Sequence, residues 1–375
     1  MSEILYQINP DRRVPWNDLP ALPIKEELYE TVEIMKKLGD AKASLARLHG
    51  RSAVIPNQGL LINTISLQEA KLSSEIENIF TTDDELYKAY SDQHSEAVGA
   101  SKEVLRYREA LWSGYNYLKE GEMFNQEYFI KIFQEIKQTT DKIRPPFIET
   151  TIKRGGTGPN AGQVIYTPPR GGGILEEKIE NLVSFINDDE QYNIDHLLKM
   201  AIAHFQFEAI HPFRDGNGRT GRVFNIHYLT SKGLLDYPIL FLSRHILDNK
   251  DDYYHCIQGV SQRGAWKDWI IFMLRAIENT SNITFDKINE IVSAKESILK
   301  YVVENGRFLN PEKLIETIFL QPFTKVNHLT NPGIYAEKTA RNYLNTLCEM
   351  QVLEKKVIEG KHYYLNLELY RILSE

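Results

Sequence analysis

The sequence predicts a mainly α-helical protein with one small β-hairpin near its middle and a second, smaller unit at its C-terminus. Three observations predict this fold class. Apolar residues recur at spacings of three and four through most of the chain. A stretch rich in glycine and proline, from Lys153 to Gly173, interrupts them around a short β-like run. After Asn305 the pattern changes to three short helices followed by a hairpin.

The elements can be assigned in order along the chain. The first two dozen residues contain four prolines, and we expect them to run extended over the body. Residues 24–49, 95–140 and 174–300 carry helical patterns broken by short turns, and a further helix is expected at about residues 66–80.

A chain of 375 residues is expected to form more than one domain. We expect an N-terminal region over residues 1–100, a main helical domain over residues 101–300 and a C-terminal domain over residues 305–375. The last boundary follows from the turn-forming pair Asn305-Gly306.

Composition restricts the partners and the compartment. The net charge of −7 argues against binding of nucleic acid or an anionic membrane by the whole chain. Two cysteines, Cys256 and Cys348, are too few for a disulfide framework, which favours a reducing compartment. The N-terminus lacks the pattern of a signal peptide, and no apolar run reaches membrane-spanning length. We therefore expect a cytoplasmic protein without membrane contact.

One amphipathic segment leads directly into a polar loop. Its apolar residues recur at helical spacing and are Ile194, Leu197, Leu198, Ala201, Ile202 and Phe205. The helix should end near His211, because the residue before a proline is pushed out of helical geometry. A second helix is expected from Arg219 to Ser231, with Gly233 suited to its C-terminal cap. The loop therefore lies between two helices.

The loop and the start of the second helix form the dodecapeptide His-Pro-Phe-Arg-Asp-Gly-Asn-Gly-Arg-Thr-Gly-Arg, residues 211–222. A helix start offers unpaired amide groups and a positive dipole end, and glycines let a phosphate approach the backbone. Arg219 and Arg222 are three positions apart and share one helix face, so both can reach the same polyphosphate. Asp215 beside them is a hard oxygen ligand that suits Mg²⁺.

The dodecapeptide resembles the signature of the Fic family, His-Pro-Phe-x-(Asp/Glu)-Gly-Asn-Gly-Arg-x-x-Arg, and fills all nine of its fixed positions. The resemblance implies a Fic-type helical bundle with a small β-hairpin flap. It also implies a protein adenylyltransferase, which transfers AMP from ATP to a Ser, Thr or Tyr hydroxyl of a target protein or of the enzyme itself, with release of pyrophosphate.

The same resemblance implies a role for each residue of the motif. His211 would be the general base, since an imidazole has a pKa near neutrality. Asp215 would hold Mg²⁺ on the phosphates. Amides around Gly216, Asn217 and Gly218, with the Asn217 side chain, would form an anion hole. The two arginines, Arg219 and Arg222, would anchor the β- and γ-phosphates of the nucleotide.

A second segment, Ser73-Ser74-Glu75-Ile76-Glu77-Asn78, resembles the inhibitory motif (Ser/Thr)-x-x-x-Glu-(Gly/Asn) of Fic proteins. On a helix Ser73 and Glu77 share one face, while Leu72, Ile76 and Phe80 line an adjacent face expected to be buried. The resemblance implies that Glu77 pairs with Arg222, displaces the γ-phosphate and so inhibits the enzyme.

The expected hairpin forms the flap of this resemblance. Residues 154–160 are turn-forming and the strand consists of Gln163, Val164, Ile165, Tyr166 and Thr167. The family's flap pairs with an extended target segment, which assigns target docking to residues 163–166. The pair Tyr253-Tyr254 corresponds to aromatic residues that lie near the adenosine in family members, although such aromatics are more often part of a core.

The C-terminal pattern is typical of a winged helix. Helices are expected at Pro311–Leu320, Thr324–Leu329 and Ala336–Met350, and a hairpin surrounds Glu359-Gly360. Winged helices often bind DNA through the third helix, where Lys338, Thr339, Arg341 and Asn342 would face a groove. However, residues 305–375 hold 9 Lys or Arg against 8 Asp or Glu, a balance of +1 that is small for binding driven by counterion release.

Two alternatives remain at this point. The C-terminal domain could dock a target or a second subunit, as in a homodimer, rather than DNA. The whole chain could instead be a DNA-binding regulator with a nucleotide-sensing Fic scaffold, or a Fic-type phosphotransferase. The intact set of catalytic residues favours the self-inhibited adenylyltransferase.

Overall fold

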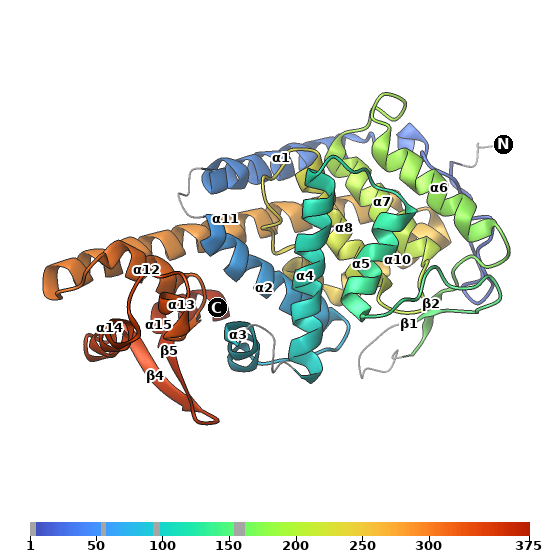
Figure 1. Cartoon of the computed structure of the whole chain (residues 1–375). Coiled ribbons are helices and arrows are strands. Elements are labelled where there is room, and N and C mark those ends of the chain that lie inside the picture. The colour runs from blue at the N-terminus through green and yellow to red at the C-terminus, as the bar shows by residue number, and fades with distance from the viewer. Residues whose placement is uncertain (1–4, 54–57, 93–97, 154–161) are drawn as a thin grey trace.

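The structure is a computed structural model that describes residues 5–53, 58–92, 98–153 and 162–375. It consists of a large helical body and a smaller C-terminal unit, and the 40-residue helix α11 (Trp266–Asn305) extends from the first to the second (Figure 1). The expectation of a mainly α-helical chain with small antiparallel sheets is confirmed.

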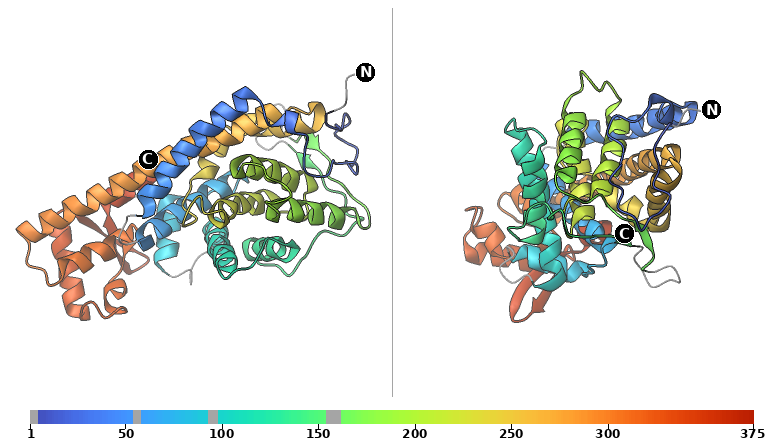
Figure 2. Two further views of the ribbon diagram at one scale, coloured as in Figure 1. Left: turned by 90° about the horizontal axis from the view of Figure 1, so that it is seen from above. Right: turned by 90° about the vertical axis from the view of Figure 1, so that its right-hand side faces the viewer.

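Helix α1 (Val32–Ala53) lies along α11 over much of its length, as the view from above shows (Figure 2). Its buried apolar residues follow a spacing of four and three, which is the pattern of paired helices, and they are Ile34, Leu38, Ala41, Leu45 and Leu48. Glu33 pairs with Lys267 at one end and Arg51 donates to Asn289 at the other, so the two helices run in the same direction. No helix in the described ranges is both long and apolar enough to cross a membrane.

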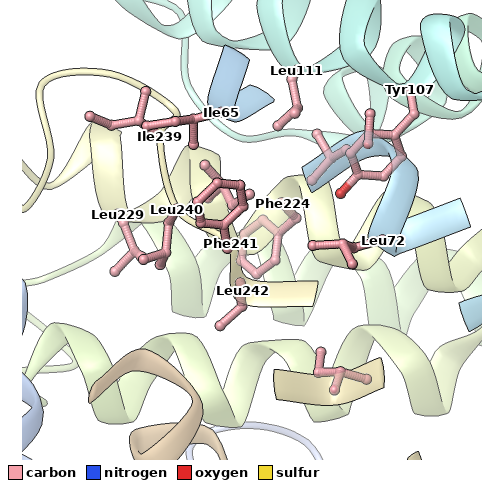
Figure 3. Close-up of a cluster of buried hydrophobic side chains, with 14 of the residues drawn as sticks. Ile65, Leu72, Tyr107, Leu111, Phe224, Leu229, Ile239, Leu240, Phe241 and Leu242 are labelled. Carbon is pink, nitrogen blue, oxygen red and sulfur yellow. The ribbon is translucent and has the colours of Figure 1, made fainter. Parts of the chain in front are cut away.

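Helices α7 (His196–Ile210) and α8 (Asn217–Ser231) lie at the centre of the body. Every residue of α7 from Leu197 to Ile210 is buried, which is typical of a helix surrounded by others. The helices around this pair are α2 (Gln58–Ile76), α4 (Gly99–Lys119), α5 (Gln126–Lys137), α6 (Ile174–Asn187), α9 (Leu242–Asp248) and α10 (Lys250–Arg263). Figure 3 shows part of their shared core, where side chains of α2, α4 and α8 meet the segment Ile239–Leu242.

The hairpin consists of β1 (Ile152–Lys153) and β2 (Val164–Tyr166), paired antiparallel. The N-terminal segment runs along the end of β2, where the Trp16 amide donates to the Thr167 carbonyl, before the short 3-10 helix η1 (Glu26–Leu28). Trp16, Leu19 and Leu22 of that segment are buried, so it packs on the body as expected. The predicted turn at residues 154–160 lies outside the described residues.

The C-terminal unit has the predicted order of three helices and a hairpin. It contains α12 (Pro311–Phe319), α13 (Asn327–Thr330), α14 (Glu337–Glu349), β4 (Leu353–Ile358) and β5 (Lys361–Asn366). Two elements were not predicted, β3 (Phe323–Thr324) and the C-terminal helix α15 (Leu367–Ser374). The expected helix Thr324–Leu329 begins only at Asn327, because Phe323 and Thr324 pair with β5 in a sheet of order β3-β5-β4.

Helix α3 (Asp83–Ser91) joins the body to the C-terminal unit. Asp92 at its end is buried and accepts hydrogen bonds from Lys325 Nζ (2.7 Å) and from the Tyr363 hydroxyl (2.8 Å). On the other side, Lys71 of α2 pairs with Asp83 at 2.7 Å. Helix α3 therefore contacts both α2 and the C-terminal unit.

The boundary of the helix predicted at residues 66–80 is wrong at both ends. Helix α2 runs from Gln58 to Ile76, since Asn78 adopts a left-handed backbone (φ 62°) that ends it, and asparagine tolerates this conformation. Leu72 and Ile76 are buried as expected, but Phe80 lies beyond the helix and is 66% exposed. Glu77 therefore follows the last turn of α2 instead of lying within the helix.

Candidate active site

His211 caps the C-terminus of α7. Helix α7 ends near His211, as expected before a proline, but the backbone of His211 is left-handed (φ 50°, ψ 60°) instead of extended, and its amide donates to the Phe207 carbonyl at 3.0 Å. Desolvation and the positive charge of Arg144 lower the pKa of His211 to about 4. The imidazole is therefore neutral at neutral pH, which is the form that a general base needs.

The loop after His211 is fixed by its own side chains. Asn217 donates to the Phe213 carbonyl and accepts from the Phe213 amide, both at 2.8 Å, so both ends of its amide group hold the loop closed. Gly216 has φ 80°, a conformation that glycine adopts without strain. Phe213 stacks on Phe133 of α5 with ring centroids 4.1 Å apart. These contacts hold the loop in one conformation against α5 and the start of α8.

The Glu77 carboxylate lies over the first turn of α8. A Cβ atom on Gly218 would come within 2.4 Å of Glu77 Oε1, so only glycine leaves room for the carboxylate there. Anions bind at helix starts because the first amides have no partner within the helix. The carboxylate of Glu77 thus lies beside the position that a phosphate group of a nucleotide would take.

Arg222 is buried and holds the segment from Ser73 to Glu77, at the end of α2, through three hydrogen bonds. Its Nε donates to Ser73 Oγ (2.8 Å), and its Nη2 donates to the Ser73 carbonyl (2.9 Å) and to Glu77 Oε1 (2.8 Å). Burial alone would raise the pKa of Glu77, but the charge and hydrogen bond of Arg222 outweigh it and lower the pKa. Glu77 and Arg222 therefore form a charged pair, and the residues of the expected inhibitory contact do meet.

Two further cations surround this pair. Arg219 donates to Glu103 of α4 at 3.0 Å, and the side chain of Arg219 is almost fully buried. Lys250 at the start of α10 donates to the Ile76 carbonyl at 2.5 Å, and its charge helps to lower the pKa of Glu77. Glu103 and Lys250 were not identified from the sequence, because each lies far along the chain from the motif that it meets.

Asp215 is a suitable metal ligand, but it does not form a complete metal site by itself. Its side chain is 72% exposed, and Lys137 of α5 donates to its Oδ2 at 2.6 Å. Burial would raise the pKa of Asp215, but the Lys137 hydrogen bond and charge lower it, so the carboxylate is ionised. Within the described residues no group of three or more His, Cys, Asp or Glu side chains could hold a metal ion. Mg²⁺ commonly binds one or two carboxylates and completes its shell with phosphate oxygens and water, and Asp215 fits that mode.

The tyrosine pair lies next to the charged pair. Tyr253 is buried and shares a hydrogen bond with His204 Nε2 at 3.0 Å, while Tyr254 is only partly buried. Glu77 and Arg222 both influence the pKa of each tyrosine, so both hydroxyl groups lie within electrostatic range of the pair. In the flap, Gln163 is exposed and Val164 half-buried, whereas Ile165 and Tyr166 are both buried.

Three family models match this chain in succession. They are described as Fic/DOC family N-terminal (residues 35–116), Fic/DOC family (residues 123–229) and the C-terminal domain of SoFic-like protein adenylyltransferases (residues 298–369). The second model contains the loop and both helices of the site. The chain belongs to the Fic/DOC family.

Curated relatives of this Fic/DOC protein are distant. A protein adenylyltransferase Fic of Aedes aegypti is 22% identical over 69% of this chain, and a probable protein adenylyltransferase of Aquifex aeolicus is 29% identical over 53% of it. A third, from Caenorhabditis elegans, is 26% identical over 35% of the chain. The chain spans less than two thirds of each relative, namely 47%, 62% and 23% of their lengths.

Solved structures support the fold of this Fic/DOC chain. A Fic family protein from Desulfovibrio desulfuricans matches with a TM-score of 0.53 and 20% identity, over 92% of this chain and 98% of the other. A Fic domain protein from Bacteroides thetaiotaomicron also has a TM-score of 0.53, with 14% identity over 67% and 97% of the two chains. At these identities the match shows a shared fold.

Proposed function

We propose that this protein is an adenylyltransferase that transfers AMP from ATP to a hydroxyl group of a protein, and that Glu77 holds it in an inhibited state. The observation that carries the proposal is the neutral imidazole of His211 next to a glycine-lined helix start that bears Arg219 and Arg222. The Fic/DOC models and the names of the curated relatives support the same activity.

The proposed reaction assigns a task to each group. The oxygen of a Ser, Thr or Tyr hydroxyl forms a bond to the α-phosphorus, and His211 takes the proton from that hydroxyl. The bond between the α-phosphorus and the bridging oxygen breaks, and pyrophosphate leaves. Arg219 and Arg222 hold the β- and γ-phosphates and so decide which phosphorus faces the nucleophile. Mg²⁺ on Asp215 would neutralise the charge that grows on the leaving group.

The inhibited state follows from the Glu77–Arg222 pair. Arg222 has its Nε and Nη2 donors on Ser73 and Glu77, which takes up three of its five N–H groups, and the carboxylate beside Gly218 repels a γ-phosphate. ATP would then bind without its α-phosphorus in line with the nucleophile. A target strand would reach the flap through the exposed Gln163 and the half-buried Val164, since Ile165 and Tyr166 are buried.

The test uses ATP labelled at either the α- or the γ-phosphate, together with Mg²⁺. Wild type, Glu77→Gly and Glu77→Gly/His211→Ala are incubated with it, and labelled protein is measured. We expect α-label on protein with Glu77→Gly, much less with wild type and none with the double variant. Transfer of γ-label alone would indicate phosphotransfer instead, and no label in any variant would contradict the proposal.

A further inference from the structure

Arg144 is a buried cation without a carboxylate partner. It lies in the irregular segment between α5 and β1 and is 2% exposed, and within the described ranges its side chain bonds to carbonyl oxygens and to no carboxylate. Burial lowers the pKa of Arg144 to about 10, so the guanidinium stays charged at neutral pH. A buried charge is expensive unless hydrogen bonds compensate it, and main-chain carbonyls take that role here.

Two of these carbonyls belong to the end of α7. Arg144 Nε donates to the His211 carbonyl at 2.8 Å, and Nη2 donates to the Ile210 carbonyl at 3.4 Å. The last carbonyls of a helix have no partner within the helix and form the negative end of its dipole. The guanidinium therefore stabilises the helix end from which His211 projects.

The remaining donors reach other segments. Nη1 donates to the Ile148 carbonyl at 3.2 Å and Nη2 to the Pro169 carbonyl, which follows flap strand β2 by three residues. The Arg144 amide donates to the Pro212 carbonyl at 2.9 Å. Arg144 thus connects the His211 loop, the segment that follows β2 and the segment that precedes β1.

We propose that Arg144 is a positioning residue. It holds the backbone of His211 and the segments that enter and leave the flap in one arrangement, so that the His211 imidazole faces the bound target hydroxyl. The expected effect of Arg144 on AMP transfer rests on the proposed function. His211 has a left-handed backbone, which is unfavourable for a residue with a side chain and persists only where the surroundings enforce it. The planar fork of arginine can bind several carbonyls at fixed angles, whereas a lysine ammonium cannot.

The test compares Arg144→Lys and Arg144→Gln in the Glu77→Gly background. The matched control is Arg108→Lys, since Arg108 is also partly buried and donates to Asn63 and Tyr90 away from His211. We expect kcat for AMP transfer to fall about 10- to 100-fold in Arg144→Lys and further in Arg144→Gln, as misplacement of reacting groups by about 1 Å does. KM for ATP should change less than about threefold, because the phosphate anchors lie on α8.

The pH dependence of kcat distinguishes a positioning role of Arg144 from a role in stability alone. The groups whose charges act on His211 are Arg144, Glu77 and Asp215, and Glu77 is absent from this background. Loss of the cation in Arg144→Gln removes a charge that disfavours the imidazolium, so the acidic limb of the kcat profile should move to higher pH. Arg108→Lys should leave both kcat and the profile unchanged even if it lowers the melting temperature.

A readout independent of activity distinguishes this proposal from the proposed function. Amide hydrogen exchange should become faster in both residues 207–218 and residues 164–170 of the Arg144 variants, and in neither of them in Arg108→Lys. Unchanged exchange in these two segments would overturn the proposal even if the parent enzyme transfers no label. Unchanged kcat in folded Arg144→Gln would overturn it where the parent is active.

Discussion

At the scale of single residues, the proposed inhibition depends on how Arg222 distributes its donors. Two of its three hydrogen bonds go to Ser73 and one to Glu77. Ser73 is fully buried, so its hydroxyl cannot be replaced by water without rearrangement. Ser73 therefore helps to hold Arg222, in addition to Glu77.

This arrangement predicts that Ser73→Ala partly releases the enzyme. The Nε donor of Arg222 would lose its acceptor, and a hydrogen bond to a charged group contributes about 1.5–3 kcal/mol. We expect AMP transfer by the otherwise wild-type chain to rise roughly tenfold, which is less than with Glu77→Gly. Initial rates with α-labelled ATP measure it.

The neighbouring Ser74 supplies the control. It is equally buried, but its hydroxyl donates only to the Ala70 carbonyl of its own helix. Ser74→Ala should therefore leave the transfer rate unchanged. Equal activation by both substitutions would mean that loosening of α2, and not the contact with Arg222, controls the rate.

At the scale of elements, the crossings of the central helices depend on small residues. Gly114 of α4 lies against His227 of α8, and an added Cβ would come within 2.3 Å of His227 Cε1. His227 cannot move aside easily, because its ring is held by Tyr128 on one side and by the Leu111 carbonyl on the other. The glycine thus sets the distance between α4 and α8.

Gly114→Ala is therefore predicted to destabilise the protein by about 1–3 kcal/mol, as overpacking does in tightly packed cores. The comparison is Gly39→Ala in α1, where an added Cβ meets nothing within 4 Å. That substitution should stabilise by up to about 1 kcal/mol, because alanine favours the helix more than glycine does. Urea unfolding of both variants measures the two changes, and a loss of stability in Gly39→Ala would contradict this account.

The helices and loops of the site were predictable where the sequence pattern that determines them lies within a few residues. The helix that ends at His211, the helix start at Asn217 and the order of the C-terminal unit follow from glycine, proline and apolar spacing within a few residues. Arg144 was not predictable, since its acceptor in His211 is 67 positions away, and Lys137 lies 78 positions from Asp215. The end of α2 was misjudged because apolar spacing continues through Phe80 while Asn78 ends the helix.

At the scale of the whole molecule, Asp92 connects the body to the C-terminal unit. The carboxylate is almost fully buried and lies close to Lys325, Tyr363 and Lys361. Burial would raise the pKa of Asp92, but the hydrogen bonds from Lys325 and Tyr363 and the two lysine charges lower it overall. A carboxyl group whose pKa is lower in the folded state stabilises that state when it is ionised.

The sign of the pH dependence follows directly. The contribution of Asp92 is complete above the pKa of an unfolded aspartate, about 3.9, and is lost as the pH falls through the lower folded value. Asp92→Asn should therefore lower the melting temperature at pH 7, and the difference from wild type should shrink towards pH 3. Asp84→Asn on the same helix is the control, because Asp84 is about half exposed and its partners, Lys356 at 3.9 Å and the Tyr370 hydroxyl, are also partly exposed, so these contacts contribute less than those of the buried Asp92. A difference for Asp92→Asn that grows on acidification would contradict the assignment.

Helix α11 connects the two units without a flexible linker, and this has a geometric consequence. Each residue of an α-helix advances about 1.5 Å and turns by roughly 100°. One residue added between Ser293 and Lys300, where the helix is partly exposed, would rotate the C-terminal unit by about that angle and separate Lys325 from Asp92. Seven added residues would nearly restore the direction, yet shift the unit by about 10 Å. The length of this helix therefore sets the rotation of the C-terminal unit, and of whatever it contacts, relative to the helical body.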